Sequence, residues 1–176
     1  MFDINVTQEQ LNYARDLVDN YNFGMRGYGD GNKDEQLTGL IGQTVFADLL
    51  GVSRPSGEIG FDGGIDFIIN DVKIDIKTMT RTVPVKNHYV HNFIGYQLKY
   101  ETQGYVFASY NKRTNVLTIC GYVTKEQFIE RAKFYKKGQL RYRDDGTYFP
   151  SKAPLYEIMQ SDLEQVDSIK LLKRII

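Results

Sequence analysis

The stretch that decides the fold is Ile65-Asp66-Phe67-Ile68-Ile69-Asn70-Asp71-Val72-Lys73-Ile74-Asp75-Ile76-Lys77. Two runs of alternating residues flank Asn70-Asp71, and both of these residues tolerate the positive φ that a two-residue hairpin turn requires. Because side chains alternate along a strand, one face of this hairpin is apolar and the other carries Asp66, Asp75 and Lys77. The stretch therefore predicts a β-hairpin in which Asp66 lies opposite Asp75.

The polar face of this hairpin has the composition of a cation site. Two carboxylates directly opposite each other repel and destabilise a sheet, and a divalent cation between them reverses the sign of that interaction. Mg²⁺ is often held by one or two carboxylates together with waters and substrate phosphate. A bound metal lowers the pKa of its water and stabilises charge on a phosphoryl oxygen, and Lys77 projects to the same side. These residues favour metal-dependent phosphoryl chemistry; an ordinary hairpin with a solvated outer face is the alternative.

The same residues resemble the PD-(D/E)xK nuclease superfamily, whose members share the restriction-endonuclease-like fold. Gly63-Gly64-Ile65-Asp66-Phe67 is similar to the first acidic motif, and Asp75-Ile76-Lys77 to the second. The helix predicted upstream, Gly39-Leu40-Ile41-Gly42-Gln43-Thr44-Val45-Phe46-Ala47, resembles the first core helix, and the similarity covers roughly residues 39–124. Two departures are the lack of a proline before Asp66 and the presence of Gln43 where many members have a glutamate ligand.

The resemblance implies a fold and an activity. The expected fold is a single α/β domain over residues 1–176, with a mixed central β-sheet flanked by helices and an αβββαβ core over about residues 34–124. The expected activity is metal-dependent hydrolysis of phosphodiester bonds in DNA, most simply by an endonuclease that uses Mg²⁺, or Mn²⁺ in its place. Many members act as dimers, so a homodimer is a further possibility.

The resemblance also assigns roles to individual residues. Asp66, Asp75 and the main-chain carbonyl of Ile76 are the implied metal ligands. Lys77 is expected to activate water or stabilise charge, and Gln43 to orient water or substrate from the helix. The alternative is a nuclease-like module that binds or assembles on nucleic acid without cutting it, because Gln43 replaces a carboxylate.

Two glutamates are further candidates for acidic contributors to the site. Glu35 lies eight residues before Gln43, about two turns earlier on a similar helix face. Asn32 and Glu35 also have the spacing of a helix N-cap and its capping-box partner, which is the stronger interpretation. Glu58 precedes the first strand, and its alternative role is that of a turn residue after Gly57.

Charge is distributed unevenly along the chain, although Lys+Arg and Asp+Glu both total 22. Residues 1–75 contain 5 basic and 13 acidic residues, which gives −8, and residues 76–176 contain 17 and 9, which gives +8. The second half is therefore expected to present a positive surface that follows a phosphate backbone, with solvated faces as the alternative. The candidate nucleic-acid contacts are Arg81, Lys86, His88, His91, Lys133, Lys136, Lys137, Arg141 and Arg143.

Capping signals and periodicity predict the other elements. Helices are expected over about 7–20, 34–50 and 92–101, and again from Thr124, where the apolar stripe is Phe128, Ile129, Ala132 and Tyr135. Strands are expected over 105–110, 116–122 and 154–159, and Ser161 is expected to open a short helix. A basic C-terminal extension covers about residues 125–176. Gln97-Leu98-Lys99-Tyr100 resembles a Gln-x-x-Tyr element of phage recombination exonucleases.

Length and composition set the remaining limits. A chain of 176 residues with 41% apolar residues suits one domain with a sizeable core. No apolar run is long enough to span a bilayer, and the N-terminus lacks the pattern of a secretory signal. Cys120 lies in a predicted strand and is expected to be a buried thiol. These features predict a cytoplasmic protein without a membrane partner.

Overall fold

The computed structural model describes residues 1–23, 31–58, 63–143 and 146–176. A five-stranded sheet forms its centre in the order β1-β6-β5-β3-β2, with β3 and β5 parallel and the other neighbours antiparallel. The predicted α/β class with a mixed central sheet is confirmed. The strands are β1 (Phe2–Asn5), β2 (Phe67–Ile69), β3 (Val72–Arg81), β5 (Gly104–Asn111) and β6 (Val116–Thr124).

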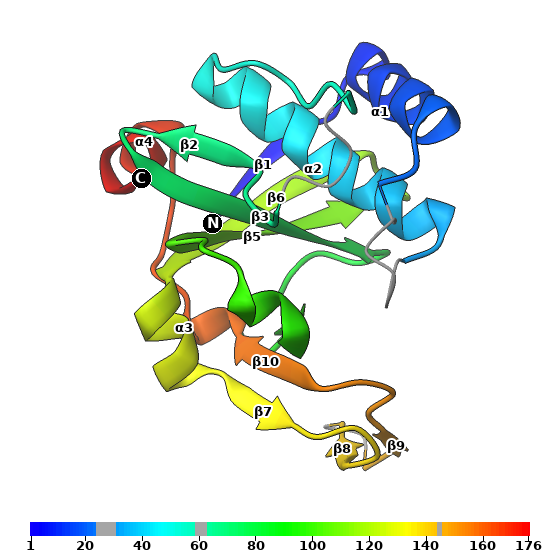
Figure 1. Cartoon of the computed structure of the whole chain (residues 1–176), viewed down its shortest axis with the longest axis vertical. Helices are drawn as coiled ribbons and strands as arrows, with labels where there is room; N and C mark the ends of the chain where they lie inside the picture. Colours follow the sequence, from blue (N-terminus) through cyan, green and yellow to red (C-terminus); the bar gives the residue numbers. More distant parts are fainter. Residues whose placement is uncertain (24–30, 59–62, 144–145) are drawn as a thin grey trace.

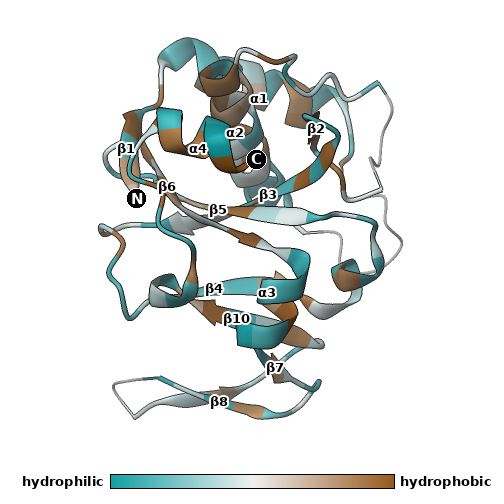
Figure 2. Ribbon diagram, turned by 90° about the vertical axis from the view of Figure 1, so that its left-hand side faces the viewer, coloured by the Kyte–Doolittle hydropathy of each residue, from teal (hydrophilic) through white to brown (hydrophobic). Residues whose placement is uncertain are grey.

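Different layers cover the two faces of this sheet (Figure 1). Helices α1 (Gln8–Asn20), α2 (Lys33–Leu50) and α4 (Ile169–Ile175) lie on one face. On the other face lies a second sheet in the order β4-β10-β7, together with helix α3 (Lys125–Arg131), as Figure 2 also shows. The strands of the second sheet are β4 (Val90–Ile94), β10 (Leu155–Met159) and β7 (Lys133–Tyr135). A separate hairpin, β8 (Leu140–Tyr142) and β9 (Tyr148–Pro150), lies at the far end.

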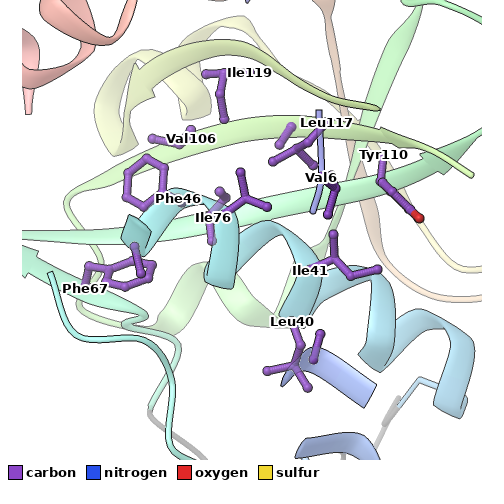
Figure 3. Packing of buried hydrophobic residues seen from close by; sticks show 14 of the residues in the cluster. Val6, Leu40, Ile41, Phe46, Phe67, Ile76, Val106, Tyr110, Leu117 and Ile119 are labelled. Carbon is purple, nitrogen blue, oxygen red and sulfur yellow. The ribbon is translucent and has the colours of Figure 1, made fainter. Parts of the chain in front are cut away.

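The central sheet buries apolar side chains on both faces. Toward α1, α2 and α4, Ile76 of β3 lies beside Phe46 of α2, as seen in Figure 3, and Ile74 belongs to the same buried cluster. The rings of Phe46 and Phe67 lie 5.2 Å apart between centroids. Toward the second sheet, the cluster includes Phe93, Tyr105, Phe107 and Phe128. The central sheet therefore separates two cores, and most side chains of its central strands β5 and β6 are buried.

Local capping explains where the helices begin and end. Thr7, Asn32 and Thr124 each form a capping box, as their sequence contexts predict. Helix α2 ends at Gly51, whose φ of 74° is the left-handed conformation that favours glycine. No helix among the described residues is long and apolar enough to cross a membrane.

Two predicted helices are wrong in type or length. The segment predicted as a helix over 92–101 is instead the end of β4 followed by a short 3-10 helix, η1 (Gly95–Lys99), because β4 pairs with the distant β10. The helix after Thr124 ends at Arg131, where the chain enters β7. Ile129, expected in its apolar stripe, is therefore 51% exposed, whereas Phe128 is buried. Ser161 lies in a second 3-10 helix, η2 (Gln160–Asp162).

Candidate functional site

The hairpin predicted from the sequence is present with the predicted turn. Asn70 and Asp71 have φ of 50° and 66°, which is the pair of positive values that a two-residue hairpin requires. The paired register runs from Phe67 opposite Ile74 to Ile69 opposite Val72. Phe67 and Ile74 are buried under α2, so the apolar face of the hairpin anchors it to the core.

Asp66 lies just before the paired part of β2 and joins three elements. Its backbone N–H donates to the Ile74 carbonyl at 3.0 Å. Its Oδ2 accepts a hydrogen bond from the Ile76 backbone N–H at 2.8 Å, and its Oδ1 accepts one from Gln43 Nε2 at 2.8 Å. The Asp66 carboxylate therefore accepts the Ile76 N–H in the way that a backbone carbonyl of a neighbouring strand would. The contact also ties the hairpin to α2 through the glutamine that the resemblance singles out.

The close approach of α2 to β3 places Gln43 beside Asp66. A methyl group at Gly42 would overlap the Thr78 hydroxyl and lie 3.0 Å from Thr78 Cβ. One helical turn earlier, Thr38 and Thr80 share a hydrogen bond of 2.7 Å between their hydroxyls. The expected close approach is thus found at Gly42. It is absent at Gly39, where a Cβ would meet nothing within 4 Å.

Asp75 and Lys77 form an ion pair on the covered face of β3. Lys77 Nζ lies 2.6 Å from Asp75 Oδ2, and their side chains are 20% and 4% exposed, respectively. Lys77 Nζ also lies 5.5 Å from the centroid of the Phe93 ring on β4. The solvated outer face that was the alternative for this hairpin is wrong for these two residues, because the second sheet covers that side.

Tyr105 is a neighbour of this ion pair that the sequence did not indicate. It lies on β5 in register with Asp75. Its hydroxyl is buried and has no hydrogen-bond partner among the residues that the structure describes. Burial and the negative charge of Asp75 both raise the pKa of Tyr105, so the phenol stays neutral and keeps a proton to donate. Sequence patterns could not reveal this residue, because its position depends on the parallel pairing of β3 with β5.

The donor atoms available here fit a hard cation. The N–H and C=O of one residue leave a strand on the same side, so the Ile76 carbonyl points toward the edge where Asp66 lies. No group of three or more His, Cys, Asp or Glu residues within the described ranges could hold a metal ion. The oxygens of this region are the Asp66 carboxylate, which accepts from Gln43 and the Ile76 N–H, the Asp75 carboxylate, which is paired with Lys77, and the Ile76 carbonyl, so a cation here would need water for its other ligands.

The segment before Asp66 is held by η1 and the residues after it. Thr102 Oγ1 donates to the Gly64 carbonyl at 2.6 Å. Gly64 has a φ of 79°, and a Cβ there would lie 2.9 Å from Cγ of Tyr100. The Gln97–Tyr100 segment singled out in the sequence therefore contacts the turn that leads into Asp66, with Gln97 buried.

The additional glutamates have other partners. Glu35 Oε2 accepts the Asn32 backbone N–H at 2.9 Å, which confirms its role in the capping box of α2. Glu58 is exposed, and its backbone N–H contacts Ser56 Oγ at 3.4 Å. Asp62, Gly24 to Asp30 and the Asp144-Asp145 turn lie outside the described residues.

Some of the predicted nucleic-acid contacts are exposed, and others already have partners within the protein. Arg81 is partly buried, donates to the Val90 carbonyl at 2.8 Å and lies over the Tyr89 ring. Arg141 is 13% exposed and is paired with Glu157, so a phosphate contact would require that pair to open. The others are exposed: Lys86, His88, Lys133, Lys136, Lys137 and Arg143.

The expectation that His91 contacts phosphate is wrong. His91 is fully buried between the two sheets, and its Nε2 lies 2.8 Å from Gln160 Oε1. Burial lowers the pKa of His91 to about 4, so the ring is neutral at pH 7. Cys120 is also buried, as expected, and burial raises the pKa of its thiol to about 12.

Two surface hollows of about 560 Å³ are lined by residues other than Asp66, Asp75, Lys77 and Gln43. The candidate site is therefore an edge of the central sheet and lies outside both hollows. Comparisons with protein-family models, curated proteins and solved structures gave no significant match.

Proposed function

We propose that this protein is a metal-dependent deoxyribonuclease that hydrolyses phosphodiester bonds in DNA, most simply as an endonuclease. The observation that carries the proposal is the conjunction of Asp66, Asp75 and Lys77 on one hairpin, with Gln43 of the packed helix donating to Asp66. A hairpin needs none of these groups for its turn or its apolar face.

The order of elements supports the resemblance to the PD-(D/E)xK superfamily. Helix α2 is followed by the hairpin β2-β3, and β5 pairs parallel to β3. The connection between β3 and β5 differs, since it contains β4 and η1 in place of the expected second core helix. The restriction-endonuclease-like core, the homodimer and the cytoplasmic location are parts of the same proposal.

Each residue has a role that follows from its position. Asp66, Asp75 and the Ile76 carbonyl would hold Mg²⁺, with Mn²⁺ as a substitute. When bound, such an ion lowers the pKa of its water and stabilises phosphoryl charge. Lys77 stabilises negative charge beside Asp75, and Gln43 keeps the Asp66 carboxylate oriented. The hydroxyl of Tyr105, which is in register with Asp75, can donate a hydrogen bond to a carboxylate oxygen of the site.

Substrate would approach from the β2 side of β3. Asp75 is 3% exposed, so the covered face does not admit a polynucleotide. On the β2 side, the described strand pairing ends at Ile74, which leaves the half-buried Asp66 at the rim of the sheet, whereas Ile76 is buried. A phosphate at this rim meets the Asp66 carboxylate first.

A second candidate is a nuclease-like module that binds nucleic acid without cutting it. Two contacts favour it: the Gln43 amide already donates to Asp66, and Lys77 already neutralises Asp75. In this case the polar groups of the hairpin stabilise the fold, and the basic second half of the chain alone contacts nucleic acid.

A cleavage assay separates the two candidates. Supercoiled, linear, branched and single-stranded DNA would be incubated with Mg²⁺, with Mn²⁺ and with EDTA. We expect metal-dependent cutting that Asp75→Asn lowers by at least about 10²-fold, with folding checked by thermal melting. Ile68→Ala is the matched control, because Ile68 lies on the same hairpin and is 65% exposed. DNA binding without cleavage under every condition would leave the binding module as the function.

A further inference from the structure

The β8-β9 hairpin presents two different faces. Residues alternate along both strands, with Tyr142 opposite Tyr148 and Arg141 opposite Phe149. Arg141 and Phe149 point to the inner face, where the Arg141 guanidinium lies 4.6 Å from the centroid of the Phe149 ring. Arg143 lies 4.8 Å from the same centroid. The alternation leaves Leu140, Tyr142, Tyr148 and Pro150 for the outer face.

Contacts at its inner face and base hold this hairpin in place. Arg141 donates to Asn92 Oδ1 at 3.0 Å and is paired with Glu157, so it joins β8 to β4 and β10. At the base, the Gly138 N–H donates to the Ser151 carbonyl at 2.7 Å, and the Ser151 N–H donates to Gln139 at 2.8 Å. The hairpin therefore presents its outer face in a defined orientation at the end of the molecule (Figure 2).

The outer face exposes aromatic rings that the fold does not use. Tyr142 is 71% exposed and Tyr148 is 63% exposed. Their ring centroids lie 5.8 Å apart, with an angle of 46° between the ring planes. Leu140, beside them, is 42% exposed. Burying apolar surface is favourable, so this aromatic strip indicates a surface that a partner covers.

The charge around the strip indicates the chemistry of that partner. Residues 133–152 contain six basic residues and two acidic ones, a net charge of +4. Of the six, Arg141 is paired with Glu157, and both Arg141 and Arg143 lie against Phe149 on the inner face. Lys136 and Lys137 lie at the base of the hairpin and are exposed. Flat aromatic faces flanked by cations are the combination that binds single-stranded nucleic acid, in which bases stack on rings and phosphates contact Lys and Arg. A strip of mainly apolar protein contacts would not require this excess of positive charge.

We propose that the outer face of β8-β9 is a stacking platform for unpaired bases of single-stranded DNA. Duplex DNA hides its base faces, so this platform selects DNA with a single-stranded segment. The inference rests on the proposed function only in naming the substrate class of the nuclease; binding to the platform does not require the metal or the hairpin β2-β3.

Equilibrium binding in EDTA tests the proposal without cleavage. The probe is fluorescein-labelled dT20, measured by anisotropy against the same length of duplex. We expect tighter binding of dT20, and a loss of at least about 10-fold in affinity for Tyr142→Ala/Tyr148→Ala, because each stacked base contributes substantially to affinity. Tyr142→Phe/Tyr148→Phe keeps both rings and should bind dT20 like the wild type. Both positions are exposed, so these variants should fold normally.

One control variant and three further outcomes make the experiment decisive. Ile68→Ala removes an exposed apolar side chain from β2, at the other end of the molecule in Figure 1, and should leave dT20 affinity unchanged. Equal dT20 affinity in the wild type and the double alanine variant overturns the platform. A second result would also overturn it: the wild type is a dimer in size-exclusion chromatography, the double alanine variant is a monomer, and both bind dT20 equally. The strip would then be a contact between protein chains. If dT20 binding depends on the rings but no DNA is cut, the platform stands and the nuclease proposal fails.

Discussion

At the scale of single residues, the contact between Gln43 and Asp66 provides a test of the proposed metal site. The Gln43 amide donates to Asp66 Oδ1 at 2.8 Å. Gln43→Glu places a second carboxylate at this distance, so we expect a lower melting temperature in EDTA and a larger gain from Mn²⁺ than in the wild type. Gln43→Ala is the control, since it loses the hydrogen bond without adding a ligand. Thermal shifts that respond to Mn²⁺ equally in all three proteins would contradict a cation beside Asp66.

The ion pair of Asp75 and Lys77 makes a second prediction at this scale. Removing one partner of a buried pair leaves an uncompensated charge, so Lys77→Ala should lower the free energy of unfolding by about 3–5 kcal/mol. Asp75→Asn/Lys77→Met removes both charges and should recover most of this loss. Urea unfolding of the single and double variants measures both effects. A loss below about 1 kcal/mol for Lys77→Ala would show that water or another group, rather than Lys77 alone, compensates the Asp75 carboxylate.

At the scale of elements, the sequence correctly predicted the hairpin and the helix starts, which depend on residues close together in the chain. The β2-β3 hairpin follows from the Asn70-Asp71 turn, and the three capped helix starts follow from residues within one turn of each cap. The segment around Val90–Ile94 was misassigned because its strand character depends on β10, more than 60 residues later in the chain. A pattern within ten residues cannot distinguish a short helix from a strand whose partner is that distant.

The packing of α2 on β3 gives a prediction at the element scale. Gly42 faces Thr78 so closely that a methyl group would overlap the hydroxyl, whereas Gly39 in the same helix faces open space. Gly42→Ala should therefore lower the free energy of unfolding by about 1–3 kcal/mol through overpacking. Gly39→Ala, the matched control, should raise it by up to about 1 kcal/mol through helix propensity.

A rescue experiment attributes the cost at Gly42 to the helix–sheet contact. Thr78→Ala removes the hydroxyl and the methyl group that the new side chain would meet. In Gly42→Ala/Thr78→Ala, the penalty of Gly42→Ala should be smaller than in the single variant. If Gly42→Ala costs the same with and without Thr78, the loss comes from another contact of α2.

At the scale of the whole molecule, the second sheet is the feature that the sequence did not indicate. The candidate hairpin, its turn and its charged residues could all be recognised in thirteen consecutive residues. The burial of Asp75, the contact of Lys77 with Phe93 and the neighbour Tyr105 depend on β4 and β5, which the chain reaches later. The sequence therefore indicated that Asp75 and Lys77 share a face of β3 but could not show that this face is covered. The Asp66 carboxylate, predicted on the same face, instead lies at the edge of the sheet, where it accepts from Gln43 of α2 and from the Ile76 N–H.

The two sheets meet at a buried polar seam whose centre is His91. His91 of β4 contacts Gln160, whose Nε2 donates to the Cys120 carbonyl of β6 at 2.8 Å. Nδ1 of His91 is buried, and no hydrogen-bond partner for it is found in the described part of the chain. The nearby charge of Arg81 adds to the effect of burial, and together they lower the pKa of His91 to about 4. A proton on this ring would be an uncompensated charge between the sheets.

This seam predicts how stability depends on pH. The pKa of His91 is about 4 in the folded protein and about 6.5 in the unfolded chain, so between these values the unfolded state binds more protons. The contribution of His91 is therefore fully present above about pH 6.5, and it decreases as pH falls toward 4, by about 2 kcal/mol between pH 7 and pH 5. Urea unfolding at both pH values measures this loss. His91→Gln should reduce it, whereas His88→Gln, which replaces the exposed histidine, should leave it unchanged. An equal loss in the wild type and His91→Gln would show that another group titrates in this range, and the second sheet would then owe its acid sensitivity to a contact other than His91.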